Sequence, residues 1–71
     1  LGYNAAQAFN NQAVDLCAQG RCVEAAALLE QALALDPGSA EMRLNYARVL
    51  ARVGRPEESR REVEKAAAKR P

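Results

Sequence analysis

Two pairs of side chains in this 71-residue sequence stand at spacings that could support chemistry. The first pair is Cys17 and Cys22, which lack the two-residue spacing of redox motifs. Two cysteines do not make a disulfide framework, and the chain has no His to complete a zinc site. We therefore expect structural thiols in a reducing compartment, a cytoplasmic location and no metal ion.

The second pair is Arg48 and Arg52, which are four residues apart and so lie one turn apart on a helix. Guanidinium groups match carboxylates in shape and charge, so this pair could hold an acidic side chain or a C-terminal carboxylate. The alternative interpretation is that both arginines are simply part of a soluble surface.

The remaining residue types argue against catalysis. The chain has no His, no Ser or Cys paired with a base, and no phosphate-binding loop. We therefore expect no enzyme activity, no catalytic residues and no cofactor. The sequence also contains no run of about 18 apolar residues, so we expect no membrane insertion.

The C-terminal segment is basic, which raises the question of nucleic-acid binding. Glutamates interrupt the basic residues, and no aromatic side chain stands among them to stack on bases. We therefore expect no nucleic-acid partner. The basic residues are Arg60, Arg61, Lys65, Lys69 and Arg70, and the glutamates are Glu57, Glu58, Glu62 and Glu64.

A period of 34 residues relates the two halves of the chain. When residues 6–37 are aligned with residues 40–71, eleven pairs are identical. This excess over chance, even for an Ala-rich chain, indicates a duplicated unit. The identical pairs are Ala6/Ala40, Asn11/Asn45, Ala13/Ala47, Leu16/Leu50, Gly20/Gly54, Arg21/Arg55, Glu24/Glu58, Glu30/Glu64, Ala32/Ala66, Ala34/Ala68 and Pro37/Pro71.

The two units carry opposite net charge. Residues 6–39 contain one basic and four acidic side chains, a net of −3, and residues 40–71 contain nine basic and five acidic ones, a net of +4. Such a division could support head-to-tail contacts between chains or an acidic partner. The alternative is a solvated surface with an uneven distribution of charge.

Local signals within each unit are those of helices. Apolar and small residues recur at three- and four-residue steps, and Gly20 and Gly54 stop a helix in each unit. Pro37 ends the second helix, Ser39 caps the third, and Pro56 suits the first turn of the fourth. We predict helices near residues 4–19, 22–35, 39–52 and 56–69.

The order of large, small and turn residues resembles the tetratricopeptide repeat family. The residues that carry this resemblance are Phe9, Ala13, Leu16, Gly20, Ala25, Leu29, Ala32 and Pro37 in the first unit, and Arg43, Ala47, Leu50, Gly54, Ser59, Val63, Ala66 and Pro71 in the second. The resemblance implies an all-α fold in which two helix–turn–helix hairpins stack as a short right-handed α-solenoid.

The same resemblance implies a single module over residues 1–71. Repeat one covers residues 6–39 and repeat two covers residues 40–71, while residues 1–5 extend the first helix or are left over from cloning. Because the chain begins with Leu1 instead of Met, we expect a fragment of a longer protein.

Several residues depart from the family pattern. Arg43 replaces a bulky residue, Gln12 stands where Leu is usual, and Cys22 and Pro56 replace an aromatic residue after the turn. Asp15 falls where an apolar side chain normally faces a preceding helix. A charge at Asp15 fits an exposed end of the stack.

The resemblance also implies a concave groove that binds a peptide or helix segment, so that the chain would serve as a scaffold or adaptor with a protein partner. The implied groove residues are Gln7, Asn10, Asn11, Val14, Cys17, Ala18, Glu41, Leu44, Asn45, Arg48, Ala51 and Arg52.

Some family members clamp a partner's C-terminal carboxylate. Asn45 matches that clamp, but Asn10 and Val14 stand where Lys and Asn are required, so we do not expect this particular activity. We expect Asn11 and Asn45 instead to form hydrogen bonds between helices.

An alternative function is self-assembly into a homodimer or a longer superhelix. The acidic first unit of one chain would dock on the basic second unit of another. The candidate self-association strip on the last helix consists of Val63, Ala66 and Ala67.

Overall fold

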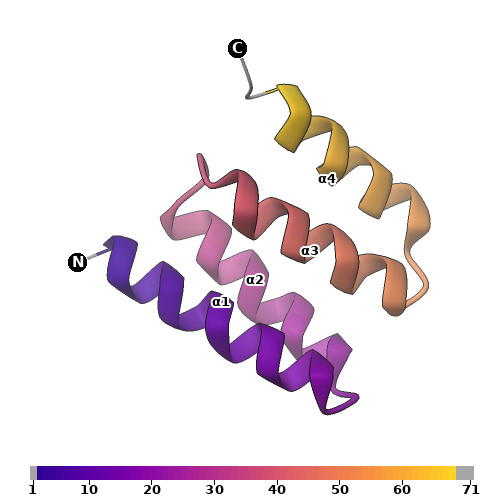
Figure 1. The fold of residues 1–71 in the computed structure, drawn as a ribbon, viewed down its shortest axis with the longest axis horizontal. Coiled ribbons are helices and arrows are strands. Elements are labelled where there is room, and N and C mark those ends of the chain that lie inside the picture. The colour runs from indigo at the N-terminus through magenta and orange to yellow at the C-terminus, as the bar shows by residue number, and fades with distance from the viewer. Residues whose placement is uncertain (1, 69–71) are drawn as a thin grey trace.

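The computed structural model describes residues 2–68, and the side chains from Asn4 onward. This part of the chain forms four helices: α1 (Gly2–Ala18), α2 (Cys22–Leu35), α3 (Ala40–Arg52) and α4 (Pro56–Ala68). Figure 1 shows α1 and α2 as one hairpin and α3 and α4 as a second, with α3 packed against the first hairpin. The predicted all-α fold is confirmed.

Helix ends agree with the sequence to within two residues. α1 begins at Gly2 and ends at Ala18, whereas residues 4 and 19 were expected, and α3 begins at Ala40 instead of Ser39. The predicted end of the last helix, at residue 69, lies outside the described residues, as do Lys69 and Arg70 of the basic set.

The two hairpin turns have the same geometry. Gly20 and Gly54 have φ of 86° and 83°, in the left-handed region that favours glycine. In each turn the next residue's N–H reaches back to close the helix end: Arg21 N donates to the Leu16 carbonyl at 2.9 Å, as does Arg55 N to Leu50. The glycines thus satisfy carbonyls that the helix ends leave free.

Each turn is followed by the same side-chain pair. Arg21 donates to both carboxylate oxygens of Glu24 at 2.7 and 2.8 Å, and Arg55 donates to both of Glu58 at 2.7 Å. All four side chains are roughly half exposed, so each pair adds little to stability. Hydrogen bonds to Arg21 and Arg55 lower the pKa of Glu24 and of Glu58, respectively, below the usual value.

Ser39 sets the start of α3, as predicted. Its hydroxyl accepts a hydrogen bond from the Met42 N–H at 3.1 Å, which satisfies a donor in the first turn of the helix. Pro56 is the first residue of α4, where its missing N–H removes no helical bond.

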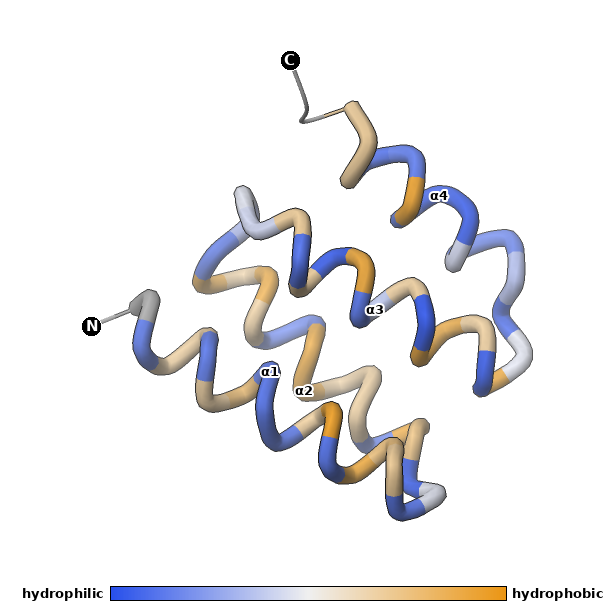
Figure 2. Tube along the Cα trace, viewed as in Figure 1, coloured by the Kyte–Doolittle hydropathy of each residue, from blue (hydrophilic) through white to orange (hydrophobic). Residues whose placement is uncertain are grey.

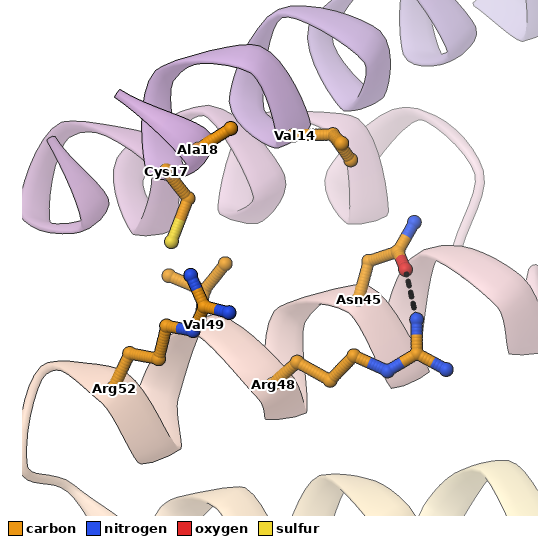
Figure 3. A pocket seen from close by; sticks show the side chains of 7 residues that line it. All are labelled: Val14, Cys17, Ala18, Asn45, Arg48, Val49 and Arg52. Carbon is orange, nitrogen blue, oxygen red and sulfur yellow. Dashed lines mark hydrogen bonds between the residues drawn. The ribbon is translucent and has the colours of Figure 1, made fainter. Parts of the chain in front are cut away.

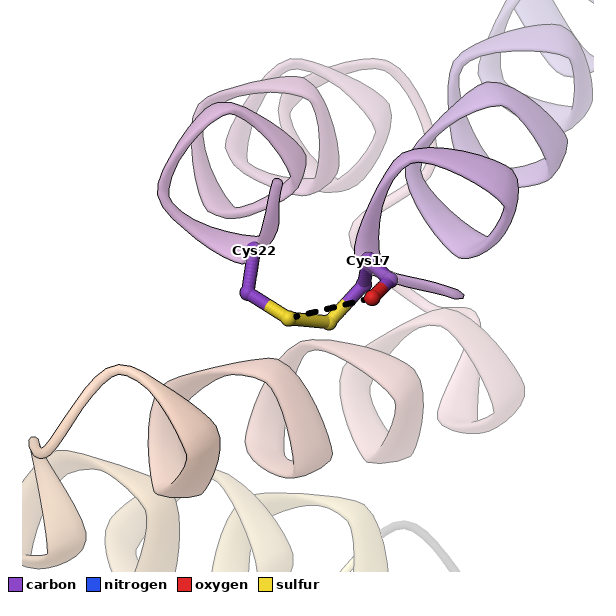
Figure 4. The surroundings of a disulfide bond; sticks show 2 residues. All are labelled: Cys17 and Cys22. Atoms are coloured by element: carbon purple, nitrogen blue, oxygen red, sulfur yellow. Dashed lines mark hydrogen bonds between the residues drawn. A yellow bond between two sulfur atoms is a disulfide. The ribbon is translucent and has the colours of Figure 1, made fainter. Parts of the chain in front are cut away.

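Cys17 and Cys22 are joined by a disulfide, so the prediction of free structural thiols is wrong. The bond ties the last turn of α1 to the first residue of α2, with the two Cα atoms 4.1 Å apart (Figure 4). The spacing alone did not reveal this, because the Gly20 turn folds the chain back and brings positions five apart into bonding range. Sγ of Cys22 also lies 3.5 Å from the Cys17 carbonyl oxygen. A hydrogen bond at this distance needs the S–H group of a reduced Cys22, because a disulfide has no hydrogen to donate.

The buried core lies mainly between α1, α2 and α3. It consists largely of small side chains, which let the helices approach closely. One cluster is Ala13, Cys17, Ala25, Ala26, Leu29 and Val49, and a second is Ala6, Ala32, Leu33 and Met42. Phe9 and Tyr46 pack against the second cluster.

The second hairpin is held together more by polar contacts. Ser59 donates from its hydroxyl to the Ala47 carbonyl oxygen at 2.7 Å, so α3 and α4 meet closely at the predicted small positions. Ala66 is the buried apolar residue of α4, and Figure 2 shows this helix as mostly hydrophilic. None of the described helices is both long and apolar enough to cross a membrane.

Arg43, which departs from the family pattern, forms an ion pair within this hairpin. It occupies the position of Phe9 one repeat later, and its guanidinium donates to Glu62 at 2.9 Å and to the Pro37 carbonyl at 2.7 Å. The Arg43 and Glu62 side chains are only 14% and 12% exposed. A long cation thus replaces an aromatic ring by extending to partners at the helix edge.

Candidate functional site

A hollow lies between the first helices of the two hairpins. Its volume is about 220 Å³, smaller than a typical small-molecule pocket and large enough for a side chain. The lining residues are Val14, Cys17 and Ala18 from α1, and Asn45, Arg48, Val49 and Arg52 from α3 (Figure 3). α1 and α3 are adjacent in the stack, which brings these residues together from positions that are about 30 apart in the chain.

The hollow combines an apolar floor with a basic edge. Cys17 and Val49 are buried in the same core cluster, and Val14 is 47% exposed. An exposed aliphatic side chain beside buried apolar atoms offers a place for an apolar group from a ligand. The basic edge consists of Arg48 and Arg52, both exposed on α3.

The two arginines have no acidic partner in the described part of the chain. Among the described residues, neither guanidinium has a carboxylate within 4 Å, whereas the arginines of both hairpin turns do. Figure 3 shows Arg48 turned along α3 toward Asn45 and Arg52 turned toward the α1 side of the hollow. The pair therefore presents uncompensated N–H donors beside an apolar surface.

A chain of side-chain hydrogen bonds orients Arg48. Asn45 donates from Nδ2 to Oδ1 of Asn10 at 3.0 Å, and its own Oδ1 accepts from Arg48 at 3.2 Å. Asn10 is only 3% exposed, so it serves the contact between the hairpins and is not free to touch a ligand. The sequence correctly gave Asn45 an interhelical role.

The same expectation for Asn11 is wrong. Its Oδ1 accepts from Gln7 Nε2 at 3.2 Å, so these two side chains bond to each other along one face of α1 and not to another helix. The other candidates do not line the hollow: Glu41 is exposed near the start of α3 and Leu44 is half-buried. The structure thus brings together Val14, Cys17, Ala18, Asn45, Arg48 and Arg52 of the expected groove residues.

Sequence reasoning missed Val49 as a lining residue. The position equivalent to Val49 in the first unit is Asp15, a charged and exposed residue, so comparing the two units gave no hint of it. The available signal was spacing, because Val49 stands one turn after Asn45 on the same helix.

A second, more open hollow surrounds the disulfide. Cys17, Cys22 and the turn residue Gly20 line one side of it, and Arg52 and Val53 line another. Cys17 and Arg52 therefore contribute to both hollows. The disulfide therefore ties Cys17, which lines the hollow between α1 and α3, covalently to the first residue of α2.

The contact between the hairpins also holds a tyrosine. Tyr46 donates from its hydroxyl to Glu30 at 2.8 Å, across the α2–α3 contact. Burial, together with the hydrogen bond to the Glu30 carboxylate, raises the pKa of Tyr46 to about 12. Tyr46 therefore stays protonated as a donor at neutral pH.

On α4, the three residues of the expected self-association strip differ in their exposure to solvent. Val63 is 44% exposed and Ala67 is exposed, whereas Ala66 is buried against α3. Ala66 thus belongs to the hairpin core and is not available to another chain.

Comparison with known proteins identifies the family. A family model described as a tetratricopeptide repeat matches residues 16–71, which is most of the chain. The chain belongs to the tetratricopeptide repeat family. The sequence matches no curated protein significantly.

Tetratricopeptide repeats generally mediate protein–protein interactions and are typically not catalytic. The family match begins near the end of α1. The helices on either side of Gly20 nevertheless form a hairpin like that of α3 and α4, and the 34-residue correspondence extends back to residue 6.

Proposed function

We propose that this chain is a scaffold or adaptor module that binds an acidic peptide segment of a partner protein. The binding site is the hollow between α1 and α3. The observation that carries the proposal is the pair Arg48 and Arg52, which lacks carboxylate partners among the described residues and borders an apolar hollow.

The ligand combines a carboxylate with a neighbouring apolar group. The carboxylate accepts hydrogen bonds from Arg48 and Arg52, and an aliphatic side chain enters the hollow against Val14 and Val49. Outside the hollow, Gln7, Asn11, Glu41 and Leu44 extend the groove and contact the flanking peptide backbone.

The occupant is a peptide and not a nucleic acid. The residues that line the hollow include no aromatic side chain on which a base could stack. The apolar wall formed by Val14 and Val49 favours an aliphatic group over a sugar–phosphate chain.

The test uses three fluorescein-labelled Gly–Ser peptides that share a central Leu. The first has a Glu beside the Leu and an amidated C-terminus, the second has no Glu and a free C-terminal carboxylate, and the third has Gln in place of Glu and is amidated. We expect the first or the second to bind more tightly than the third, by about tenfold for a carboxylate held by guanidinium groups. Equal affinity for all three would contradict the proposal.

Matched variants locate the site. Arg48→Ala and Arg52→Ala should each weaken binding of the carboxylate peptide, while Arg61→Ala, an exposed arginine on α4, should leave it unchanged. Binding should also weaken as salt rises, because the arginines are exposed. An equal loss in Arg61→Ala would mean that net charge, and not this hollow, holds the peptide.

A further inference from the structure

One face of α4 is uncovered in the described part of the chain. α4 packs against α3 and against no other described helix. Arg60, Val63, Glu64 and Ala67 are exposed on it. The first hairpin indicates what could cover this face. Its helix α2 is equivalent to α4, and α3 packs against α2.

Three residues of α2 are linked to three residues of α3 in that covered face, either by a shared core cluster or by a hydrogen bond. Ala26 shares a core cluster with Val49, and Leu33 shares one with Met42. Glu30 accepts a hydrogen bond from Tyr46 at 2.8 Å. One hydrogen bond and two shared core clusters therefore link α2 to α3 at these positions.

The 34-residue period carries each pair to a new position. On the α2 side, Ala26, Glu30 and Leu33 become Arg60, Glu64 and Ala67 of α4. On the α3 side, Val49, Tyr46 and Met42 become Asp15, Gln12 and Ala8 of α1. All six of these residues are exposed.

The translated pairs match chemically. Placed opposite each other, Asp15 and Arg60 would form an ion pair in place of an apolar contact, and Ala8 and Ala67 would keep an apolar contact. Gln12 opposite Glu64 keeps the hydrogen bond, because the Gln12 amide donates where the Tyr46 hydroxyl donates. Asp15, which departs from the family pattern, stands where α3 has Val49, and Arg60 stands where α2 has Ala26. An acidic and a basic residue thus replace the two apolar residues together.

We infer that the exposed face of α4 binds α1 of a second copy of this chain, head to tail. The second copy continues the stack in the way that α3 continues it after α2. The contact joins different faces of the two copies, so it adds copies in an open series and does not close into a two-fold dimer. This surface is separate from the hollow and does not depend on the proposed peptide binding.

The docking is weaker than the contact between the hairpins of one chain. The Asn45–Asn10 hydrogen bond has no counterpart, because Leu44 stands at the position equivalent to Asn10. Ala8 and Ala67 also bury less apolar area than Met42 and Leu33. Arg60 already donates to Glu57, and its remaining N–H groups are available to Asp15.

Sedimentation equilibrium of the full chain over a hundredfold range of concentration tests the inference. We expect the average mass to rise with concentration at low salt and to rise less at high salt, since the ion pair is exposed at the edge of the contact. Asp15→Arg and Arg60→Asp should each abolish most of this association. Arg61→Asp makes the same change of charge next to the face and should leave the association intact.

Mixing the two variants gives the sharpest result. Each variant alone sets like charges against each other at every contact. In a mixture of Asp15→Arg and Arg60→Asp chains, one kind of contact restores the native pairing of Asp15 with Arg60. The other kind sets the introduced arginine of one variant opposite the introduced aspartate of the other. Association should therefore return on mixing, which a misfolded variant could not produce. A monomer at every concentration, no recovery on mixing, or an equal loss in Arg61→Asp would overturn the inference.

Discussion

The two hairpins have the same backbone arrangement but are held together by different side-chain interactions. The first is tied by the Cys17–Cys22 disulfide and filled by buried alanines and Leu29. At the positions equivalent to the two cysteines, the second hairpin has Ala51 and Pro56, and it is joined by the Ser59 hydrogen bond and by the Arg43–Glu62 ion pair. The glycine turns define the path of the chain, and the residues between the helices determine how strongly each hairpin is held.

This difference predicts uneven stability. α1 and α2 contribute most of the buried apolar residues, whereas α4 contributes Ala66. Helices with few buried apolar contacts open at lower free energy than the core does. We therefore expect the first hairpin with α3 to be the stable part of the molecule and α4 to be the part that opens most easily.

The largest expected effect comes from truncating the same repeat position in each hairpin. Leu29 is 0% exposed and Val63 is 44% exposed. Leu29→Ala should reduce the free energy of unfolding by about 2–5 kcal/mol, because it leaves a cavity, and Val63→Ala by less than about 1 kcal/mol. Urea denaturation followed by circular dichroism measures both. Similar losses at the two positions would remove the distinction between the hairpins.

Reducing the disulfide should have the next largest effect. The cross-link closes a loop between residues five apart, which corresponds to about 2 kcal/mol of stability in the chain-entropy description. Dithiothreitol should lower the urea midpoint of the native chain. The Cys17→Ser/Cys22→Ser double variant should already have the lower midpoint and should not respond to the reductant. A midpoint unaffected by reduction in the native chain would contradict this prediction.

Removing one partner of the buried ion pair tests the polar closure of the second hairpin. Glu62→Ala should cost about 1–2 kcal/mol, because the mostly buried guanidinium of Arg43 loses a charged acceptor. Replacing both residues, as Arg43→Met/Glu62→Met, should cost less than Glu62→Ala alone, because no buried charge remains. Urea denaturation measures the free energy of unfolding of both variants. If Arg43→Met/Glu62→Met were less stable than Glu62→Ala, the ion pair itself would be the main source of stability.

The smallest expected effect concerns the two equivalent turns. Hydrogen bonds to Arg21 and Arg55 lower the pKa of Glu24 and Glu58 in the folded state. A lowered folded-state pKa means that the pairs stabilise the fold above the unfolded-state pKa of about 4.3, and that this contribution is lost as the pH falls through the folded-state pKa. Carboxyl NMR titration of the native chain should place both groups below the usual range.

Arg21→Gln is the matched test of the turns. It should return the pKa of Glu24 toward its usual value and leave Glu58 unchanged, since Glu58 keeps Arg55. A shift of both carboxyls would mean that overall charge, and not the paired guanidinium, sets these pKa values.

The features that sequence predicted well depend on local chemistry. Gly20, Gly54, Ser39 and Pro56 act within one turn of the chain, so their roles follow from residue type and position. The stacking of two hairpins was implied by the resemblance to the tetratricopeptide repeat family, which rests on the order of small and large residues in each unit.

The features that sequence missed depend on which side chains meet in space. The disulfide forms because the turn brings Cys22 back to Cys17, and the burial of Asn10 depends on the approach of Asn45 from the other hairpin. Arg43 looked like a defect in the pattern, yet its length lets it reach Glu62 on α4 and the Pro37 carbonyl. Each of these contacts needs the packed helices to be known.

The most direct test of the proposed function is a two-dimensional ¹H–¹⁵N NMR titration of the oxidised chain with the Glu–Leu peptide. We predict that the largest shifts occur at Val14, Asn45, Arg48, Val49 and Arg52, and that the matched Gln peptide produces much smaller ones. Shifts centred on α4, or no shifts up to millimolar peptide, would contradict the assignment of the hollow between α1 and α3 as the binding site.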